Sequence, residues 1–440
     1  MSDQTTTYAW VESEHLGEKY CRILHKSGLQ IYVLPKKFTT TYAVFGTRFG
    51  AIDNCFRIAG ETKWTKVPDG VAHFLEHKMF EAEDGSDTNE RFACLGASAN
   101  AFTSSDMTAY EFSCTENVYE SLHVLLEYVT HPYFTADNVE KEQGIIGQEI
   151  GMCDDNPVRR LYYELLSLLY RRNHIRINVC GTVSSISEIT PQILYRCYQV
   201  FYQLSNMALV ICGDVDVEQI ITVADAELAV QTPNEIDRYF EAEPAELAKK
   251  RVTVPMLVGV PLFAIGIKDN RPPLSGDARA KRNLALRVAG SMLFGTSGDF
   301  YSALYDEGLL NGNFSFGYET SRTAAFYIIS GESKDPEAVY RRVWETVKAW
   351  RECPMSREDF ERIRRSEYAS LIRIFDAADD VAIELLSDLF DGVEMFSMGD
   401  LLMSLTYEEV MKECEALFLE EYAAMAVIAP RDDVTEAEVS

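Results

Sequence analysis

The sequence predicts an α+β protein made of two homologous domains, each a mixed β-sheet with helices packed on it. The chain has 440 residues and no low-complexity tract, whereas a single hydrophobic core rarely grows beyond about 250 to 300 residues. Short β-rich runs alternate with helical patterns along the first half. A capped helical pattern at 135–142 (TADNVEKE) returns at 356–363 (SREDFERI), an offset of 356 − 135 = 221 residues.

The composition is that of an ordinary globular protein, with 47% hydrophobic and 25% charged residues. Lys and Arg number 41 against 69 Asp and Glu, so the formal net charge is −28. Such a charge opposes binding to phosphate backbones and to anionic lipid surfaces. We therefore expect no nucleic-acid partner and no membrane partner. An acidic surface could attract basic peptides, but it also serves simply to keep a protein soluble.

The cysteines and the N-terminus indicate the compartment. The ten cysteines are scattered without a C-x-x-C pair, which is typical of reduced thiols. No basic segment followed by an apolar one opens the chain, and the longest apolar stretch, 423–430, is much shorter than the roughly 20 residues that span a membrane. We expect a soluble, cytoplasmic protein.

Local patterns place the elements of the first half. β-rich runs predict strands at 29–34, 41–49, 97–103, 107–113 and 206–214. Helical spacing predicts helices at 71–80, at 122–128 and from 135 to about 152. Asp69 is the expected cap of the helix at 71–80.

That helix carries an unusual group of side chains. The chain has only seven histidines, and two of them, His73 and His77, stand four residues apart with Glu76 between them. Positions i and i+4 share one helix face, so both imidazoles can reach one ion, and Glu76 can lean toward the open coordination position. This H-x-x-E-H string is the reverse of the H-E-x-x-H zinc motif. Chance produces such a string on the order of once in a hundred chains of this composition.

A catalytic zinc ion needs a third protein ligand and a position left for water. Glu142 and Glu149 are the candidates, because they stand seven residues apart on one face of the helix that follows Thr135. Either glutamate alone could equally be a solvated helix charge. Gly144, Gly147 and Gly151 on the same helix predict a close approach of another backbone.

The expected domain boundary lies in the stretch 231–248, which is rich in acids and contains two prolines. We expect a zinc-binding domain at 1–230, this linker, and a duplicated domain at 249–440. At the offset of 221 residues, the His-bearing helix corresponds to a segment near Leu293 and Phe294 without His or acid. A duplicated second domain would therefore have no metal site, although two unrelated capped helices could also produce the match.

Several segments resemble the inverted-motif zinc metallopeptidases of the insulinase, pitrilysin and mitochondrial processing peptidase family. They are 70–77 (GVAHFLEH), 96–103 (GASANAFT), 108–110 (TAY), 139–150 (VEKEQGIIGQEI), 206–207 and 213–214. The second half matches mainly at 356–370 and 294–299 (FGTSGD). Within the family, the sequence is most similar to the compact bacterial proteins that resemble processing peptidases.

The resemblance implies an α/β roll in each domain and a clam-like chamber formed by the two. It also implies that His73, His77 and Glu149 bind one zinc ion per chain, that Glu76 is the general base, and that Glu142 supports the site. Hydrolysis of a peptide bond by a zinc-activated water would follow.

The resemblance further implies a substrate site. The strand at 97–103 would be an exposed edge to which a peptide adds as an extra strand. Its expected substrate-binding residues are Ala99, Asn100, Ala101 and Phe102.

One departure from the family pattern concerns partners. Active members carry an Arg and a Tyr seven residues apart in the second domain, but the corresponding stretch, 302–311, has Tyr305 in place of Arg and no clear Tyr. The chain would then be the catalytic subunit of a heterodimer whose metal-free homologous subunit supplies this pair, or else a homodimer. Local replacement by Tyr301, Tyr318 or Arg322 is the alternative.

The motif and the resemblance together lead to two hypotheses about function. The first is a zinc endopeptidase that hydrolyses short peptides or processes polypeptide segments. The second is a non-proteolytic scaffold or maturation factor in a larger assembly, with a possible link to elongation factor modification that the resemblance suggests.

Overall fold

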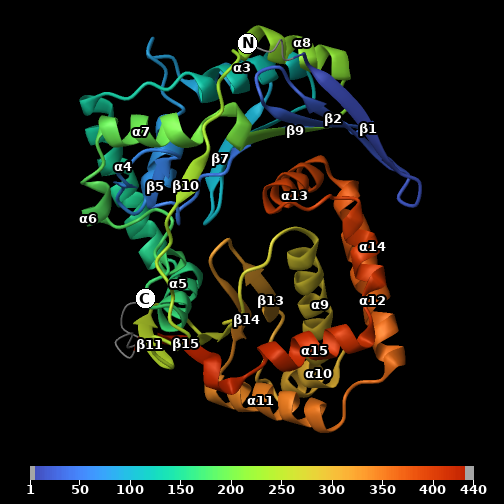
Figure 1. Cartoon of the computed structure of the whole chain (residues 1–440). Helices are drawn as coiled ribbons and strands as arrows, with labels where there is room; N and C mark the ends of the chain where they lie inside the picture. The colour runs from blue at the N-terminus through green and yellow to red at the C-terminus, as the bar shows by residue number, and fades with distance from the viewer. Residues whose placement is uncertain (1–4, 432–440) are drawn as a thin grey trace, which may run out of the picture. The chain divides into compact units, whose positions relative to one another are not determined.

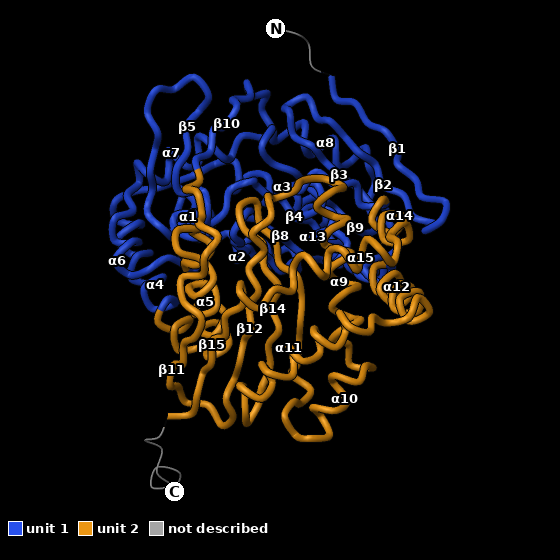
Figure 2. Tube along the Cα trace, turned by 60° about the horizontal axis from the view of Figure 1, so that its bottom comes forward, with its two compact units in different colours: residues 1–150, 178–239, 372–396 blue, residues 151–177, 240–371, 397–440 orange. Residues whose placement is uncertain are grey.

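The computed structural model describes residues 5–431, which form two compact units (Figure 1 and Figure 2). Unit 1 comprises the chain up to 150 together with 178–239 and 372–396, and unit 2 comprises 151–177, 240–371 and the chain from 397 onward. Two segments thus differ from the contiguous domains expected at 1–230 and 249–440. Residues 151–177 belong to unit 2, and residues 372–396 belong to unit 1.

Unit 1 is built on a seven-stranded sheet with the order β1-β2-β3-β9-β4-β8-β7. Its strands are β1 (Thr7–Ser13), β2 (Glu18–Leu24), β3 (Gln30–Pro35), β4 (Thr41–Thr47), β7 (Ser98–Thr103), β8 (Thr108–Cys114) and β9 (Met207–Gly213). All neighbours are antiparallel except β3 and β9. The five strands predicted in this half are confirmed, whereas β1 and β2 were not predicted.

Both faces of this sheet are covered, since every residue of its central strands β4 and β9 is buried. The helices of unit 1 are α1 (Val71–Lys78), α2 (Thr88–Cys94), α3 (Val118–Thr130), α4 (Ala136–Asp155, up to residue 150), α6 (Val183–Ile186), α7 (Pro191–Phe201), α8 (Val217–Glu227) and α13 (Ala378–Asp391). The three predicted helices correspond to α1, α3 and α4.

The helix α13 comes from the second half of the chain but packs on β4 and β9 of unit 1 (Figure 1). Val44 and Val210 meet Leu385 and Leu386 in one buried cluster. Gly46 makes room for the helix, since a Cβ there would lie 2.7 Å from Cδ2 of Leu386. Burial of each such leucine contributes about 1.5 to 3 kcal/mol to folding.

Unit 2 repeats this arrangement with a five-stranded sheet of order β11-β15-β12-β14-β13. The strands are β11 (Arg251–Met256), β12 (Leu262–Lys268), β13 (Ser315–Thr320), β14 (Ala325–Glu332) and β15 (Ala423–Pro430). Only β11 and β15 are parallel. Order and directions match those of β3-β9-β4-β8-β7, which confirms the prediction of two homologous domains.

The counterpart of α13 in unit 2 is α5 (Pro157–Leu169), which packs on β12 and β15. Gly266 of β12 admits it, because a Cβ there would lie 2.8 Å from Cδ1 of Leu169. Each half of the chain therefore contributes one helix to the sheet of the other half. The other helices of unit 2 are α9 (Gly276–Phe294), α10 (Asp299–Asp306), α11 (Pro336–Glu352), α12 (Arg357–Ile372), α14 (Ser397–Ser404) and α15 (Tyr407–Leu417).

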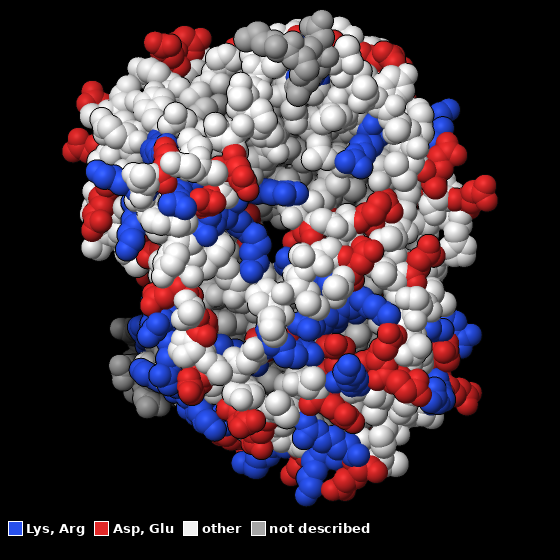
Figure 3. All heavy atoms as spheres, viewed as in Figure 1, with Lys and Arg blue, Asp and Glu red and all other residues white. Residues whose placement is uncertain are grey.

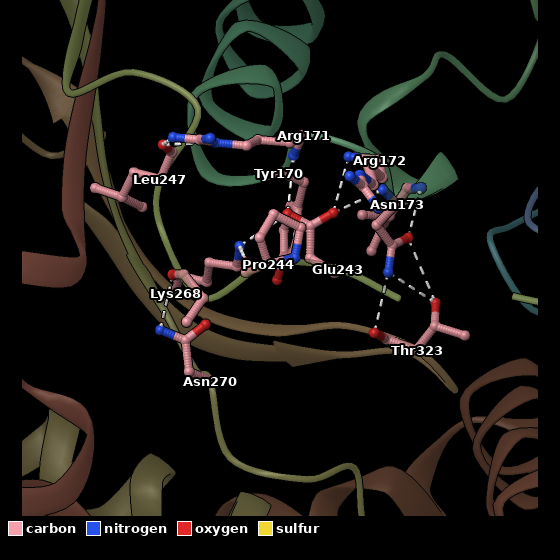
Figure 4. A network of polar contacts seen from close by, with 12 residues as sticks. Tyr170, Arg171, Arg172, Asn173, Glu243, Pro244, Leu247, Lys268, Asn270 and Thr323 are labelled. Atoms are coloured by element: carbon pink, nitrogen blue, oxygen red, sulfur yellow. Dashed lines mark hydrogen bonds and ion pairs between the residues drawn. The ribbon is translucent and has the colours of Figure 1, made fainter. Parts of the chain in front are cut away.

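The change of unit at residues 239–240 falls inside the predicted linker 231–248, and segments on both sides of that change are fixed within a unit. Within unit 1, β10 (Ile236–Arg238) forms a small sheet with β5 (Cys55–Ile58) and β6 (Thr65–Lys66). In unit 2, the Glu243 carboxylate accepts the backbone N–H groups of 171–173 and pairs with Lys268 Nζ at 2.9 Å (Figure 4). The acidic, proline-containing stretch therefore marks the change of unit, but it is not a flexible linker.

Acidic and basic side chains are intermixed over the face drawn in Figure 3. The ten cysteines are free thiols, and most are buried. Within residues 5–431, no helix has both the length and the apolar character needed to cross a membrane.

Asp388 of α13 is a buried carboxyl group whose replacement should stabilise the protein. Its pKa is raised well above the usual value by burial and then by the nearby charges of Glu384, Asp391 and Glu394, and its Oδ2 has no hydrogen-bond partner among the described residues. The folded state thus retains a proton that the unfolded state releases above a pH of about 4, which costs stability as the pH rises. We expect Asp388→Asn to raise the Tm at pH 7 by a few degrees.

Thermal unfolding at several pH values tests this expectation. The gain should shrink as the pH falls toward about 4 and disappear below about pH 3, where both states hold the proton. Asp380→Asn, an exposed acid on the same helix, is the control and should change the Tm little. A gain of equal size at pH 4 would contradict the explanation.

Candidate metal centre

The helix α1 holds the centre in a buried position. All of its residues except His77 are buried, and it packs against β7, β8 and α7. The expected Asp69 cap is wrong: the N-cap is Gly70, which makes no side-chain cap bond, and the Asp69 carboxylate accepts a hydrogen bond from Asn54 Nδ2 at 2.6 Å.

Gly70 is required because two backbone segments meet there. Its φ is +90°, and a Cβ would lie 2.5 Å from the carbonyl oxygen of Cys180. Gly181 has a φ of +75°, and a Cβ there would lie 2.5 Å from the carbonyl oxygen of Asp69. This contact places the loop at 180–181 beside the start of α1.

His73 and His77 of α1 meet Glu149 of α4. The distance from His73 Nε2 to Glu149 Oε1 is 3.6 Å, and that from His77 Nε2 to Glu149 Oε2 is 3.5 Å. Donor atoms of all three residues lie within 4.8 Å of one another. Tetrahedral ligands at about 2.0 to 2.1 Å from one zinc ion stand about 3.3 Å apart, so small shifts close this set around an ion. The side chains of His77 and Glu149 are 28% and 33% exposed, which leaves access from solvent.

Glu142 supports His77 from the other side. One α4 face carries Glu142 and Glu149, and Glu142 Oε1 lies 3.1 Å from His77 Nδ1. A proton on Nδ1 directed at this carboxylate leaves the lone pair of Nε2 for the donor set. Burial alone would raise the pKa of Glu142, but the hydrogen bond with His77 and the charge of Lys78 outweigh it and lower the pKa.

The pKa of the His77 imidazole is raised, whereas that of Glu142 is lowered. Burial lowers the pKa of His77, but the hydrogen bond to Glu142 and the charges of Glu76, Glu142 and Glu149 outweigh burial and raise the pKa. A proton therefore competes with a metal ion for this side chain at lower pH.

Glu76 lies next to the donor set without belonging to it. Its carboxyl is buried, and Thr103 Oγ1 donates a hydrogen bond to Oε2 at 2.5 Å. Burial raises the pKa of Glu76 to about 7, against the opposing effects of Thr103 and His77. A carboxyl that titrates near neutrality is suited to accept a proton and to return it.

The strand that contains the predicted substrate-binding residues is the edge of the sheet, as expected. β7 pairs only with β8 among the described strands. Asn100 is exposed, and Ala99, Ala101 and Phe102 are half-buried. Because the last residue of β7 is Thr103, the edge ends directly at Glu76.

Three residues of the centre were not predicted from the sequence. Thr103 contacts Glu76, and Lys78 lies 3.5 Å from Glu142 Oε2. Cys180 Sγ lies 3.9 Å from both His73 Nε2 and Glu149 Oε1. Only Lys78 had a signal in the sequence, as a charged residue in an otherwise apolar helical pattern.

The prediction drawn from the three glycines of α4 is wrong. A Cβ at Gly144, Gly147 or Gly151 would meet nothing within 4 Å, so no backbone approaches them closely. Glycine spacing on a helix does not distinguish a tight contact from an open face.

The stretch compared with the Arg and Tyr pair lies in unit 2. Tyr305 of α10 is 56% exposed and stacks on Tyr301. Tyr301 donates to the carbonyl oxygen of Asn311, and Tyr318 donates to Asp269 Oδ2 at 2.7 Å. Arg322 follows β13 in the turn before β14.

Comparisons with known proteins give the family. The profile of the insulinase family, peptidase family M16, matches residues 59–183, and the profile of the M16 inactive domain matches 188–367. The uncharacterized zinc protease YmfH of Bacillus subtilis is 36% identical over 96% of this chain and 99% of its own. The chain belongs to peptidase family M16.

Further M16 relatives agree in length and fold. The crystal structure of an M16-like peptidase from Alicyclobacillus acidocaldarius superposes with a TM-score of 0.88, at 32% identity over 97% of this chain and 99% of that one. The β subunit of the mitochondrial processing peptidase of Caenorhabditis elegans is 21% identical over 84% of this chain and 83% of its own. The M16 match at 59–183 spans His73, Glu76, His77, Glu142 and Glu149.

The contact at Gly70 makes a prediction about stability. Gly70→Ala adds a side chain at positive φ, which costs roughly 1 to 3 kcal/mol, and also forces the Cys180 carbonyl away. Gly60→Ala is a matched control, since Gly60 has φ of +91° and nothing within 4 Å of the added Cβ. Urea unfolding should show a clearly larger loss for Gly70→Ala, and equal losses would contradict the role of the contact.

Proposed function

We propose that this protein is a zinc-dependent endopeptidase that hydrolyses short peptides or processes polypeptide segments. The observation that carries the proposal is the set of donors from His73, His77 and Glu149 within 4.8 Å of one another, beside the buried carboxyl of Glu76. Two imidazoles and one carboxylate are a common protein ligand set of a catalytic zinc ion.

In this proposal, His73, His77 and Glu149 hold one zinc ion per chain. A zinc ion held there would supply polarisation of the scissile carbonyl and would lower the pKa of water. Glu76 accepts the proton of the attacking water and returns it to the leaving nitrogen. Thr103 orients the Glu76 carboxyl, and Glu142 orients the His77 ring.

A peptide would bind along β7. Its backbone would pair with the free edge of the strand at Ala99 to Phe102, and the exposed Asn100 side chain would contact the peptide backbone. Since β7 ends at Glu76, a strand added there would lead its scissile bond to the general base.

A second candidate function is that of a non-proteolytic scaffold. Tyr305 stands where active members carry Arg, and 188–367 match the inactive M16 domain. On the catalytic proposal, a metal-free homologous subunit supplies the missing pair. A homodimer would provide the Arg and Tyr pair only if another side chain of this chain took the place of the missing Arg.

A peptide digest tests the catalytic proposal. Purified protein, with zinc added, is incubated with peptides of mixed sequence, and products are read by mass spectrometry. We expect cleavage that a chelator abolishes. Glu76→Gln should abolish hydrolysis and retain zinc, because the ligands remain, whereas His77→Ala should lose both.

The outcomes separate the candidate functions. Full activity of Glu76→Gln would contradict its role as general base. If the zinc-loaded wild type cleaves no peptide, a metal-free homologue from the same source is added and the digest is repeated. Cleavage restored by that homologue supports the heterodimer, and continued inactivity favours the scaffold.

The ligand role of Glu149 is tested by metal affinity. Glu149→Gln removes the only anionic donor of the set, so zinc affinity should fall by more than the roughly 10- to 100-fold that loss of a supporting residue costs. Glu140→Gln, an exposed position on the same helix, is the control and should leave the affinity unchanged. Unchanged zinc binding by Glu149→Gln would transfer the ligand role to another carboxylate.

A further inference from the structure

Lys78, directly after His77 on α1, is a fully buried lysine with 0% exposure. Lysine is almost never fully buried unless it is paired, since removal of an ammonium group from water costs several kcal/mol. The charge must therefore be held by its surroundings.

Two carboxylates surround the ammonium group. Lys78 Nζ lies 2.7 Å from Glu81 Oε2 and 3.5 Å from Glu142 Oε2. The first pair joins residues three apart on the chain, and Glu81 is one-third exposed. The second pair reaches across to α4, where the side chain of Glu142 is almost fully buried.

Glu142 uses its two oxygens for two different partners. Oε1 faces His77 Nδ1 at 3.1 Å, and Oε2 faces Lys78 Nζ. His77 and Lys78 are consecutive residues of α1, so the two groups fix the carboxylate at both oxygens. The carboxylate cannot rotate without losing one of these contacts.

Stability alone does not explain a lysine at this position. Replacement of a buried ion pair by apolar side chains of similar volume is often neutral or stabilising, and the residues one turn before Lys78 on α1, Phe74 and Leu75, are apolar and buried. Apolar side chains at both 78 and 142 would fill the same space without burying any charge. The charge is explained if it acts on Glu142.

We propose that Lys78 is a positioning residue of the metal centre: it fixes the Glu142 carboxylate that orients the His77 imidazole toward the donor set. The inference rests on the proposed zinc site. Without Lys78, one buried oxygen of Glu142 loses its cation, the carboxylate gains alternative orientations, and the His77 ring is held less firmly. Lys78 does not contact the donor atoms in the described contacts, so its effect on zinc must pass through Glu142.

A double-mutant cycle tests this route. Zinc affinity is measured by competition with a chelating dye for the wild type, Lys78→Met, Glu142→Gln and the double variant. We expect Lys78→Met to weaken binding by about 10-fold, and we expect little further loss when Lys78→Met is added to Glu142→Gln. Glu81→Gln is the control, because it removes the outer partner and leaves the contact with Glu142.

The cycle distinguishes positioning from a merely structural role. Equal losses from Lys78→Met with and without Glu142 would overturn the inference while leaving the zinc site intact. Absence of zinc binding by the wild type would overturn the proposed function and this inference together. Melting of each variant in chelator checks folding, and Lys78→Gln replaces Lys78→Met in the cycle if the methionine variant does not fold.

Discussion

The pairing of α1 with α4 is the interaction on which the centre depends. One short helix buries Glu76, His73 and Lys78 and half-buries His77, a concentration of ionisable groups that an apolar environment tolerates only when each group has a partner. The carboxylates of α4 supply partners for His73, His77 and Lys78, and Thr103 of β7 supplies one for Glu76. The charges that would destabilise α1 alone are thus compensated by side-chain contacts with α4.

The fold brings the other parts of the centre to this helix pair. A sheet edge that ends beside Glu76 has no second neighbour among the described strands, and the backbone contact at Gly70 closes the opposite end of α1. Both units use one topology with a helix from the other half of the chain on each sheet. Neither sheet completes its core without that helix, so folding of each unit requires both halves.

Much of this could be predicted from sequence because it depends on local periodicity. Four-residue spacing places His73 and His77 on one face of α1, and seven-residue spacing does the same for Glu142 and Glu149 on α4. Short runs of β-branched, aromatic and other apolar residues predicted the central strands. These inferences need only helix and strand geometry, whereas the duplication was inferred from one repeated helix pattern together with the family resemblance.

Only the tertiary structure decided which groups meet. Sequence spacing left both glutamates as ligand candidates, whereas the fold places Glu149 at both Nε2 atoms and Glu142 at Nδ1 of His77. The role of Thr103, the partner of Lys78 and the exchange of α5 and α13 were likewise beyond the sequence. All of them are contacts between residues far apart in the chain, and such contacts depend on how whole elements pack rather than on any local pattern.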